Sequence, residues 1–324
     1  MYNQTEAILS QYEIELQEVL KGRGSFICDT DKGKWMLVPF HGSKEKGLLL
    51  HRFLAELLEK GFLVEQIMLT KEQDAVAEDE YTGERFLLKS YVDGTEISTG
   101  KLEDMKEAVR MLAIYHNISR EVAEKNEMKR RNEGVTESWQ RHYRELIKVR
   151  NYIRNCKKKN EFEQIYMRHF EHNRRAAEES LQMLEASSAD FKHYLICHGD
   201  FNQHNVLLSK GMYRIVHFEN FEYHWGMLDL ANFIRKMLEK NEWNEKTGRE
   251  LIAEYDRYRT ISTEEYRLLY GLLLFPEKFW KVTNHYMNSR KTWISGREID
   301  KLKKVIEQEE QRLKFMENVF AFLR

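Results

Sequence analysis

Proline and cysteine are scarce in this chain of 324 residues, which contains two prolines and three cysteines. Cys28, Cys156 and Cys197 are widely spaced and form no C-x-x-C pair, so the sequence excludes a disulfide framework and a zinc site built on cysteine pairs. No low-complexity linker or internal repeat is evident either. We therefore expect a globular chain whose thiols are reduced and belong to the core.

Long apolar runs and an excess of one charge are missing as well. No run approaches the ~20 apolar residues of a membrane span, and the segment Met1 to Glu6 is polar, so we expect neither a signal peptide nor a membrane anchor. The 52 lysines and arginines balance 53 aspartates and glutamates. Because acidic residues interleave with Arg174, Arg175 and Lys157 to Lys159, we interpret these basic residues as solvated helix faces and expect no nucleic-acid partner.

The first hundred residues have the pattern of a small mixed lobe. Apolar runs and turn signals predict, in chain order, two strands, a helix, a strand and a further hairpin. The expected elements are Ser25 to Asp29, Lys34 to Phe40, the helix Lys44 to Lys60 that stops at Gly61, Leu63 to Thr70, and the hairpin Ala75 to Glu80 with Arg85 to Val92. From Lys101 onward the periodicity is helical. With 42% hydrophobic residues the chain can bury a large core, which we expect in two lobes, 1–92 and 101–324, joined by a hinge at 93–100.

A loop that could carry catalytic residues follows the apolar run Tyr194 to Ile196. It reads His198-Gly199-Asp200 and continues over four residues to Asn205. This is the spacing of a phosphotransferase catalytic loop, in which the aspartate accepts the proton of the attacking hydroxyl and the asparagine binds Mg²⁺. We predict Asp200 as the general base, Asn205 as a metal ligand and His198 as the residue that holds the shape of the loop. The alternative is a capped turn between strands without chemistry.

A second metal ligand is expected twelve residues after Asn205, where a kinase-like chain carries an aspartate at the end of the next strand. His217 stands there instead, and a neutral imidazole is a poor ligand for Mg²⁺, which prefers hard oxygens. Glu219 lies two residues further on and is a candidate replacement if the strand continues. The alternative is that His217 and Glu219 are simply polar residues at a strand end.

The lysine that binds phosphate in kinases is missing from its expected strand. In the predicted order of elements this is the second strand, and its middle carries Val38. A displaced Lys34 or Lys44 is the remaining candidate. Without this lysine, Glu56 and Glu59 on the following helix have no evident ion-pair partner, and we expect both to be surface or cap residues.

Two further segments are candidate nucleotide contacts. Gly22 and Gly24 lie in a polar turn and could fold over phosphates through backbone amides, although such turns are commonplace. Tyr91, Val92 and Asp93 follow a buried strand and could form a hinge where an adenine bonds to backbone groups, but a plain linker would have the same sequence. ATP with Mg²⁺ is therefore the cofactor that the sequence suggests.

The loop and its surroundings resemble a known family. His198-Gly199-Asp200 with Asn205, then Phe218-Glu219, Gly226 and Asp229-Leu230-Ala231, are similar to the aminoglycoside phosphotransferase and choline kinase branch of the protein kinase-like fold. Five further segments resemble the CotS family of bacterial spore coat proteins: Asn202 to Leu207, Phe233 to Trp243, Pro276 to Lys281, Asn284 to Ser289 and Trp293 to Gly296. The resemblance implies an α+β, two-lobed fold with a small mixed β-sheet lobe and a large, mainly helical lobe.

This resemblance also has implications for single residues and for partners. It implies that Asp229 braces the catalytic loop and that late helices wall a substrate cleft. The candidate residues of that wall are Trp280, His285, Asn288 and Trp293, and the alternative is a core helix whose aromatic residues pack under the loop. The family further implies synthesis in the mother cell of a sporulating bacterium, deposition in the spore coat and contact with other coat proteins.

Two functions remain open from the sequence. One is a coat protein whose kinase-like fold is a degenerate, pseudokinase scaffold or a nucleotide- or ligand-binding coat component, without phosphoryl transfer. The other is an ATP- and Mg²⁺-dependent phosphotransferase acting on a small hydroxylated molecule, a sugar or a coat protein, with Asp200 as the base. The missing lysine and His217 favour the scaffold, whereas Asp200 and Asn205 keep the enzyme open.

Overall fold

The computed structural model describes residues 2–22, 24–125, 134–188, 194–288 and 296–323. Its contacts divide the chain into two compact units. The first comprises Met1–Ser98, Ile114–Met128 and Leu195–Glu222, and the second comprises Thr99–Ala113, Lys129–Tyr194 and Tyr223–Arg324. The lobes predicted from the sequence follow the order of the chain, whereas the compact units interleave, and the catalytic-like loop belongs to the first unit.

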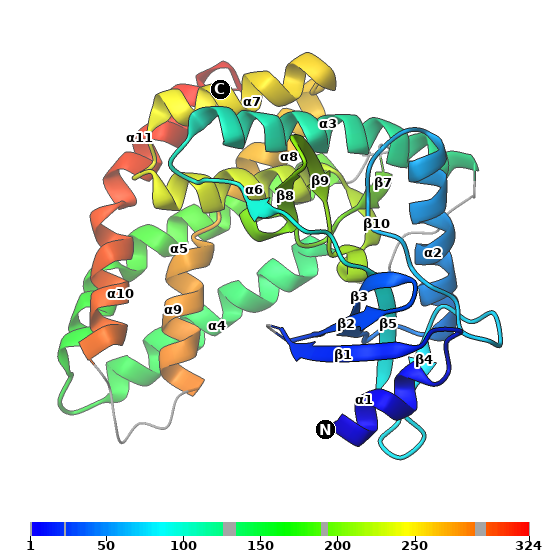
Figure 1. The fold of residues 1–324 in the computed structure, drawn as a ribbon. Helices are drawn as coiled ribbons and strands as arrows, with labels where there is room; N and C mark the ends of the chain where they lie inside the picture. Colours follow the sequence, from blue (N-terminus) through cyan, green and yellow to red (C-terminus); the bar gives the residue numbers. More distant parts are fainter. Residues whose placement is uncertain (1, 23, 126–133, 189–193, 289–295, 324) are drawn as a thin grey trace. The chain divides into compact units, whose positions relative to one another are not determined.

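The first unit contains a five-stranded antiparallel sheet with the order β1, β2, β3, β5, β4 (Figure 1). The strands are β1 (Leu16–Lys21), β2 (Phe26–Thr30), β3 (Gly33–Pro39), β4 (Ala77–Glu78) and β5 (Arg85–Ser90), with α1 (Tyr2–Leu9) before them and α2 (Lys44–Glu59) between β3 and β4. Buried residues from α1, the segment after it and one face of the sheet form a common core: Ile8, Leu9, Tyr12, Cys28, Leu37, Ala77, Phe86 and Leu88.

Most elements predicted for this region are confirmed. The first predicted hairpin is β2 and β3, and the second is β4 and β5 with shorter strands than expected. The predicted helix is α2, whose amino terminus is capped by Ser43 through a hydrogen bond from the Lys46 amide (3.2 Å). These elements follow from local patterns, because the residues that define each of them lie within a few positions of one another.

The strand predicted for Leu63 to Thr70 is wrong. The segment is irregular and makes two isolated bridges, Val64 to Ile215 and Ile67 to Lys89. Its apolar residues resemble a strand because they are buried, but Glu65 is buried among them and bonds to backbone amides of another segment. Burial rather than strand pairing therefore explains the apolar content of this segment.

α1 and β1 were not expected from the sequence. In β1 the half-buried positions recur every third residue, so the strand lacks the alternation that identifies a half-buried strand. With β1 in place, Gly22 and Gly24 lie in the turn between β1 and β2 rather than before the first strand.

A three-stranded antiparallel sheet in the same unit carries the catalytic-like hairpin. Its order is β6 (Thr95–Glu96), β8 (Val206–Ser209) and β9 (Met212–Ile215), so part of the segment predicted as a hinge forms a strand. The short helices η1 (Gln203–Asn205) and η2 (Phe218–Asn220) flank the β8–β9 hairpin, which is drawn in green in Figure 1. Two further strands, β7 (Tyr194–Cys197) and β10 (Glu222–Trp225), cross the boundary between the units.

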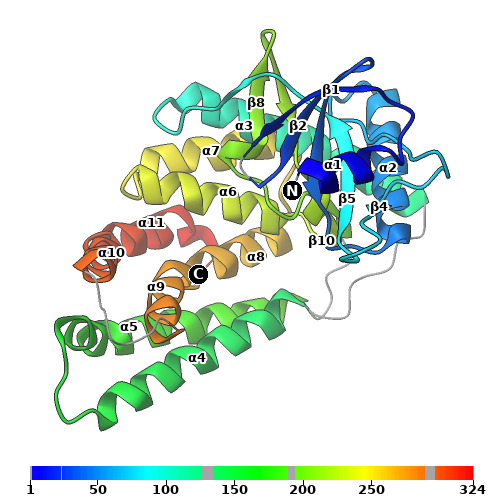
Figure 2. The same ribbon diagram turned by 60° about the horizontal axis from the view of Figure 1, so that its bottom comes forward.

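The second unit is helical, as the periodicity beyond residue 101 predicts. Its helices are α4 (Val135–Asn155), α5 (Glu161–Ser188), α6 (Met227–Lys240), α7 (Glu245–Tyr258), α8 (Thr263–Leu274), α9 (Glu277–Asn288), α10 (Gly296–Glu307) and α11 (Glu309–Val319), followed by η3 (Ala321–Leu323). α3 (Leu102–Lys125) begins in this unit and ends in the first. α4 and α5 lie side by side as a long hairpin (Figure 2). α9 packs against α4, and α10 packs against α5. No helix among the described residues combines the length and the apolar content needed to cross a membrane.

Candidate functional site

The loop after β7 is held in shape by His198, whose side chain is fully buried. Its Nδ1 accepts a hydrogen bond from the Asp200 amide (3.2 Å), and its Nε2 lies 2.9 Å from the Val216 carbonyl oxygen, to which it can only donate. His198 is therefore a neutral imidazole protonated on Nε2. It connects the start of the loop to the end of β9.

Asp200 and Asn205 lie within hydrogen-bonding distance of each other. The Asn205 Nδ2 donates to the Asp200 carbonyl oxygen (2.8 Å) and lies 3.4 Å from its carboxylate Oδ2. Asn202 caps η1 by accepting a hydrogen bond from the His204 amide (2.8 Å), which fixes the turn between the two residues. The amide nitrogen of Asn205 is thus directed at Asp200, and Asn205 Oδ1 has no hydrogen-bond partner in the described part of the chain. The catalytic roles of Asp200, His198 and Asn205 stay predictions.

Gly199 is required by the backbone at this point. Its φ is +81°, a region that favours glycine, and a Cβ there would lie 2.0 Å from the carbonyl oxygen of Asn220. The loop therefore passes directly over the end of η2, which follows His217 and contains Glu219.

Lys89, on β5, supplies a buried ammonium that the sequence interpretation missed. Its side chain is 1% exposed, and its Nζ contacts the carboxylates of Glu65 (3.1 Å) and Glu219 and lies 2.9 Å from His217 Nδ1. In the sheet Lys89 pairs with Met36, two residues before Val38 on β3. Because alternate residues share a face, Lys89 lies on the same face of the sheet as Val38, one strand away from the position where a lysine was sought.

Each N–H of the Lys89 ammonium has an acceptor. A lysine has three such donors, and here Glu65, Glu219 and His217 provide one acceptor each. Since Nδ1 of His217 faces a donor, it acts as an acceptor, and the ring is neutral with its proton on Nε2. The cluster thus satisfies its ammonium internally.

Glu65 connects this ammonium to the chain segment that follows β9. Its Oε1 accepts hydrogen bonds from the amides of His217 (2.9 Å) and Phe218 (3.2 Å), the first amides of η2. A carboxylate at the amino end of a helix satisfies amides that have no partner within the helix. Glu65 is 2% exposed, so its charge depends on these amides and on Lys89.

Of the three candidate metal positions, His217 and Glu219 are engaged in this cluster. His217 adopts a left-handed conformation (φ +70°, ψ +55°) that ends the strand and starts η2. Glu219 is therefore not on a continuing strand, as its candidate role assumed, but within η2, where it pairs with Lys89. The other lysines considered lie elsewhere: Lys34 is near Asp29 (4.0 Å) and Lys44 pairs with Asp74 (2.9 Å).

On α2, Glu59 is exposed as expected, whereas Glu56 is half-buried and pairs with the exposed Lys125 (3.2 Å). The buried carboxylate that pairs with Lys89 is thus Glu65, which follows α2, and not a residue of the helix.

The ionisation of Glu219 makes the stability of the cluster depend on pH. Burial opposes the charge of Glu219, but the Lys89 ammonium beside it holds the pKa of this carboxyl well below its usual value of 4.5. A lowered pKa in the folded state gives stability that is present above pH 4.5 and is lost as the pH falls towards the folded-state pKa.

We expect Glu219→Gln to reduce the loss of stability on acidification by about 2 kcal/mol, because the variant no longer takes up this proton on unfolding. Urea unfolding at a series of pH values on both sides of the ordinary glutamate pKa measures the effect. Glu59→Gln, which removes an exposed carboxylate without an ion pair among the described residues, should leave the pH dependence unchanged. Equal pH profiles for the wild type and Glu219→Gln would contradict the assignment.

The side chains of the site do not fit a resident Mg²⁺. This ion needs several hard oxygen ligands, and within the described residues no three His, Cys, Asp or Glu side chains are grouped so that they could hold a metal. Asn205 offers an amide oxygen, whereas the Glu219 carboxylate already pairs with Lys89. A metal at this point would have to compete with a buried ammonium.

The candidate nucleotide contacts have ordinary backbone roles. The Gly22 amide donates to the Ser25 carbonyl oxygen (2.8 Å), which closes the β1–β2 turn, and Gly24 has a φ of +72°. The Tyr91 amide donates to the Lys34 carbonyl oxygen (3.1 Å) just beyond β5. Val92 is half-buried and Asp93 is exposed. Nucleotide binding by these residues stays a prediction.

The remaining predicted residues lie in the second unit. Asp229 is buried in the first turn of α6, where a negative charge is favourable; its bracing role stays a prediction. Trp280 stacks on His142 (3.4 Å between ring centroids) and donates to Glu145 (2.7 Å), which ties α9 to α4. His285 is exposed and lies 3.9 Å from Glu298. Asn288 is also exposed, and its amide bonds to Asn284 (3.1 Å). Trp293 lies outside the described residues.

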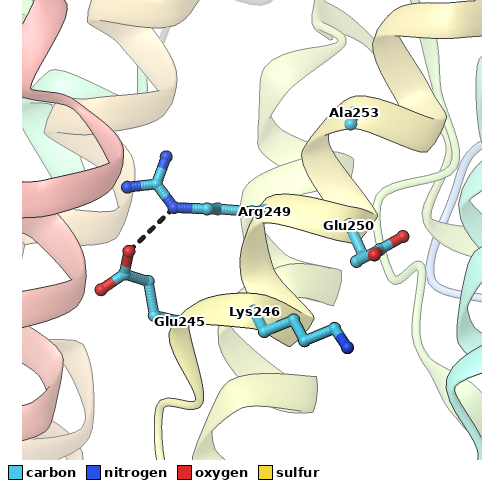
Figure 3. A pocket seen from close by; sticks show the side chains of 5 residues that line it. All are labelled: Glu245, Lys246, Arg249, Glu250 and Ala253. Carbon is cyan, nitrogen blue, oxygen red and sulfur yellow. Dashed lines mark hydrogen bonds and ion pairs between the residues drawn. The ribbon is translucent and has the colours of Figure 1, made fainter.

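An open pocket of about 570 Å³ is found on α7 of the second unit. It is lined by Glu245, Lys246, Arg249, Glu250 and Ala253, all from one helix, and Figure 3 shows Arg249 directed at Glu245. Glu250 in turn lies 3.5 Å from Lys106. Because most of its charges are paired and a single helix lines it, this pocket has no evident chemical function.

Comparisons with known proteins agree with the fold and with the resemblance seen in the sequence. Residues 5–319 match the family model described as "Spore coat putative kinase YutH". Spore coat protein S of Bacillus subtilis (strain 168) is 23% identical over 96% of this chain and 92% of its own length.

Solved structures give the same fold. An aminoglycoside phosphotransferase from Alicyclobacillus acidocaldarius superposes with a TM-score of 0.85 at 20% identity, covering 98% of this chain and 96% of its own. A microcompartment-associated aminopropanol kinase superposes with a TM-score of 0.65 at 12% identity, covering 100% and 99%. The predicted fold is thus confirmed: a kinase-like fold of the aminoglycoside phosphotransferase type, with a small antiparallel-sheet lobe and a mostly helical lobe.

Proposed function

Since this chain belongs to the spore coat YutH family of kinase-like proteins, we propose that it is a coat component whose kinase-like fold serves as a binding scaffold without phosphoryl transfer. It is made in the mother cell, is deposited in the spore coat, and binds other coat proteins there. The proposal rests on the charge cluster in the first unit.

The main support for this proposal is that every N–H group of the Lys89 ammonium already has an acceptor within the protein. A lysine that stabilises a transferring phosphate must direct its N–H groups at phosphate oxygens. All three donors of Lys89 have protein acceptors, and the side chain is 1% exposed. The Glu219 carboxylate occupies the place next to the ammonium that an anionic ligand would need.

Loss of this contact has a large expected effect on catalysis. One preorganised electrostatic contact to the transition state typically supplies about 3 kcal/mol, which corresponds to a rate factor of about 100. With His217 in place of an aspartate and Glu219 bound to Lys89, the Asn205 amide oxygen has no second hard-oxygen ligand among the candidates from the sequence. Both losses favour binding over chemistry.

A second candidate function is favoured by the geometry of Asp200 and Asn205. The Asn205 amide bonds to Asp200, and His198 fixes the loop from the other side. In a phosphotransferase, Asp200 would accept the proton of a substrate hydroxyl, and the substrate would be a small hydroxylated molecule, a sugar or a coat protein. ATP with Mg²⁺ would then be the cofactor.

Nucleotide binding separates the two functions. For a scaffold we expect no metal-dependent rise in melting temperature when the purified chain is titrated with ATP and Mg²⁺ or Mn²⁺. A nucleotide that binds only the folded state would raise stability by about 2.7 kcal/mol at a hundred times its dissociation constant, which a thermal-shift measurement detects.

The variants Asp200→Asn and Asn205→Ala complete this experiment. Under the scaffold proposal both titrate like the wild type. A metal-dependent shift that is present in the wild type and absent in Asn205→Ala would overturn the proposal and establish the nucleotide site of the second candidate. An active phosphotransferase of the same fold, measured in parallel, shows that the conditions detect binding.

A further inference from the structure

The end of the α4–α5 hairpin carries a concentration of positive charge that the catalytic-like site does not use. Residues 146–160 contain six basic residues and no acidic residue, although the whole chain has a net charge of −1. The six residues are Lys148, Arg150, Arg154, Lys157, Lys158 and Lys159. The interleaving of acids expected from the sequence holds for Arg174, which pairs with Glu171 and Glu178, but not for this stretch.

None of these six side chains forms an ion pair with any residue that the structure describes. Arg150 bonds to the Asn151 side chain (3.3 Å) and lies over the Phe170 ring, and Lys159 donates to the Cys156 carbonyl oxygen (3.1 Å). On the neighbouring helix α5, by contrast, Arg174 and Arg175 pair with Glu171, and Arg174 also pairs with Glu178. The cluster thus differs from the basic residues that follow it on α5.

The acidic residues that follow the cluster are already engaged. Glu161 pairs with Lys303 of α10 (2.6 Å). Glu163 is buried, accepts a hydrogen bond from the Asn160 amide (3.0 Å), and bonds to the Tyr286 hydroxyl (3.2 Å). These two carboxylates therefore do not pair with the cluster, which stays available to an anionic partner.

The positive charges surround the end of the hairpin rather than one face of it. On α4 the buried residues Leu146, Val149 and Ile153 form a stripe that packs in the core of the unit. With 100° per residue, Lys148 falls on one side of this stripe and Arg154 on the other. The three remaining lysines lie in the connection between α4 and α5, at the free end of the hairpin in Figure 2.

We propose that the end of the α4–α5 hairpin binds the surface of an anionic lipid bilayer. Clusters of four to eight lysines and arginines are attracted to negatively charged membranes by delocalised electrostatics, without a pocket. A helical hairpin end with charges on all sides meets a flat surface well, and Tyr152, which is 38% exposed between the basic residues, is a side chain that favours the membrane interface.

A nucleic acid or an acidic peptide fits this end less well. Single-stranded nucleic acids are held in grooves with several aromatic platforms, and the segment offers one exposed ring, Tyr152. A bound peptide needs a groove with apolar anchors, whereas the apolar residues of this end of α4 are packed inside the core. The charge pattern therefore favours a lipid surface.

Vesicle sedimentation of the full chain tests the proposal. The wild type should sediment with vesicles that contain phosphatidylglycerol and stay in solution with vesicles of phosphatidylcholine alone. The triple variant Lys157→Gln, Lys158→Gln, Lys159→Gln should bind about a hundred-fold more weakly, because each lysine near an anionic surface contributes a factor of about five. Added salt should weaken the wild-type binding as well.

A matched control removes the same charge elsewhere. Lys32, Lys210 and Lys240 are exposed and have no ion pair among the described residues, and their triple replacement by glutamine should leave vesicle binding unchanged. Equal binding of both triple variants, or equal sedimentation with both lipids, would overturn the proposal. The proposal would also be overturned if the wild type bound duplex DNA or polyglutamate but did not bind anionic vesicles.

Discussion

Replacement of Lys89 by methionine is expected to lower the free energy of unfolding by about 3–5 kcal/mol, because it leaves two buried carboxylates without their counter-charge. Glu65 is 2% exposed and cannot be solvated, although the amides of His217 and Phe218 still satisfy part of its charge. Urea unfolding followed by circular dichroism measures the change at neutral pH.

Two comparisons make this result specific. Lys34→Met removes a lysine that is 57% exposed and 4.0 Å from Asp29, and it should change stability by no more than about 0.5 kcal/mol. The triple variant Lys89→Met, Glu65→Gln, Glu219→Gln should recover part of the loss, because no uncompensated charge remains. If Lys89→Met unfolds with the wild-type free energy, the buried ion cluster described here does not exist in solution.

Replacement of Gly199 by alanine should lower the free energy of unfolding by roughly 2–6 kcal/mol. The added Cβ would lie 2.0 Å from the Asn220 carbonyl oxygen, and its φ of +81° is unfavourable for alanine. The loop that carries Asp200 would have to move away from η2. The measurement is again urea unfolding.

Gly211 provides the matched control for this variant. It lies in the β8–β9 turn of the same unit with a φ of +78°, but no heavy atom lies within 4 Å of a Cβ built there. Gly211→Ala therefore tests the backbone conformation alone and should lower stability by about 1 kcal/mol. Similar losses for both variants would mean that the contact between the loop and η2 is not tight.

The sequence predicted the parts of the fold that depend on neighbouring residues. The hairpins, α2 and the late helices have local periodicity, and the loop of His198, Asp200 and Asn205 carries its chemistry within eight residues. Its hydrogen bonds also form within the same stretch and with the following strand. In such features, residues that are close in the sequence are also close in space.

Lys89 and Glu65 were missed because their roles depend on distant pairing. Lys89 has the appearance of any polar residue in an apolar strand, and its place beside Val38 follows only from the register between β3 and β5. Glu65 was assigned to a strand that does not form. The sequence did contain a signal for both residues. Lys89 directly follows the apolar run Phe86 to Leu88, and Glu65 is a single charged residue in an apolar segment.

The first unit is built from three separate segments of the chain, and this affects the order in which the chain folds. Lys89 finds one of its three acceptors, Glu65, among the residues before it, but His217 and Glu219 follow it by more than a hundred positions. During synthesis the sheet of β1 to β5 emerges long before the segment Leu195–Glu222 that completes its unit. Until that segment is made, the ammonium lacks two of its three acceptors, and an incompletely satisfied buried charge is costly, so we expect the face of the sheet that carries Lys89 to stay solvated on the ribosome. The unit closes late, through contacts distant in sequence, which are slow to form.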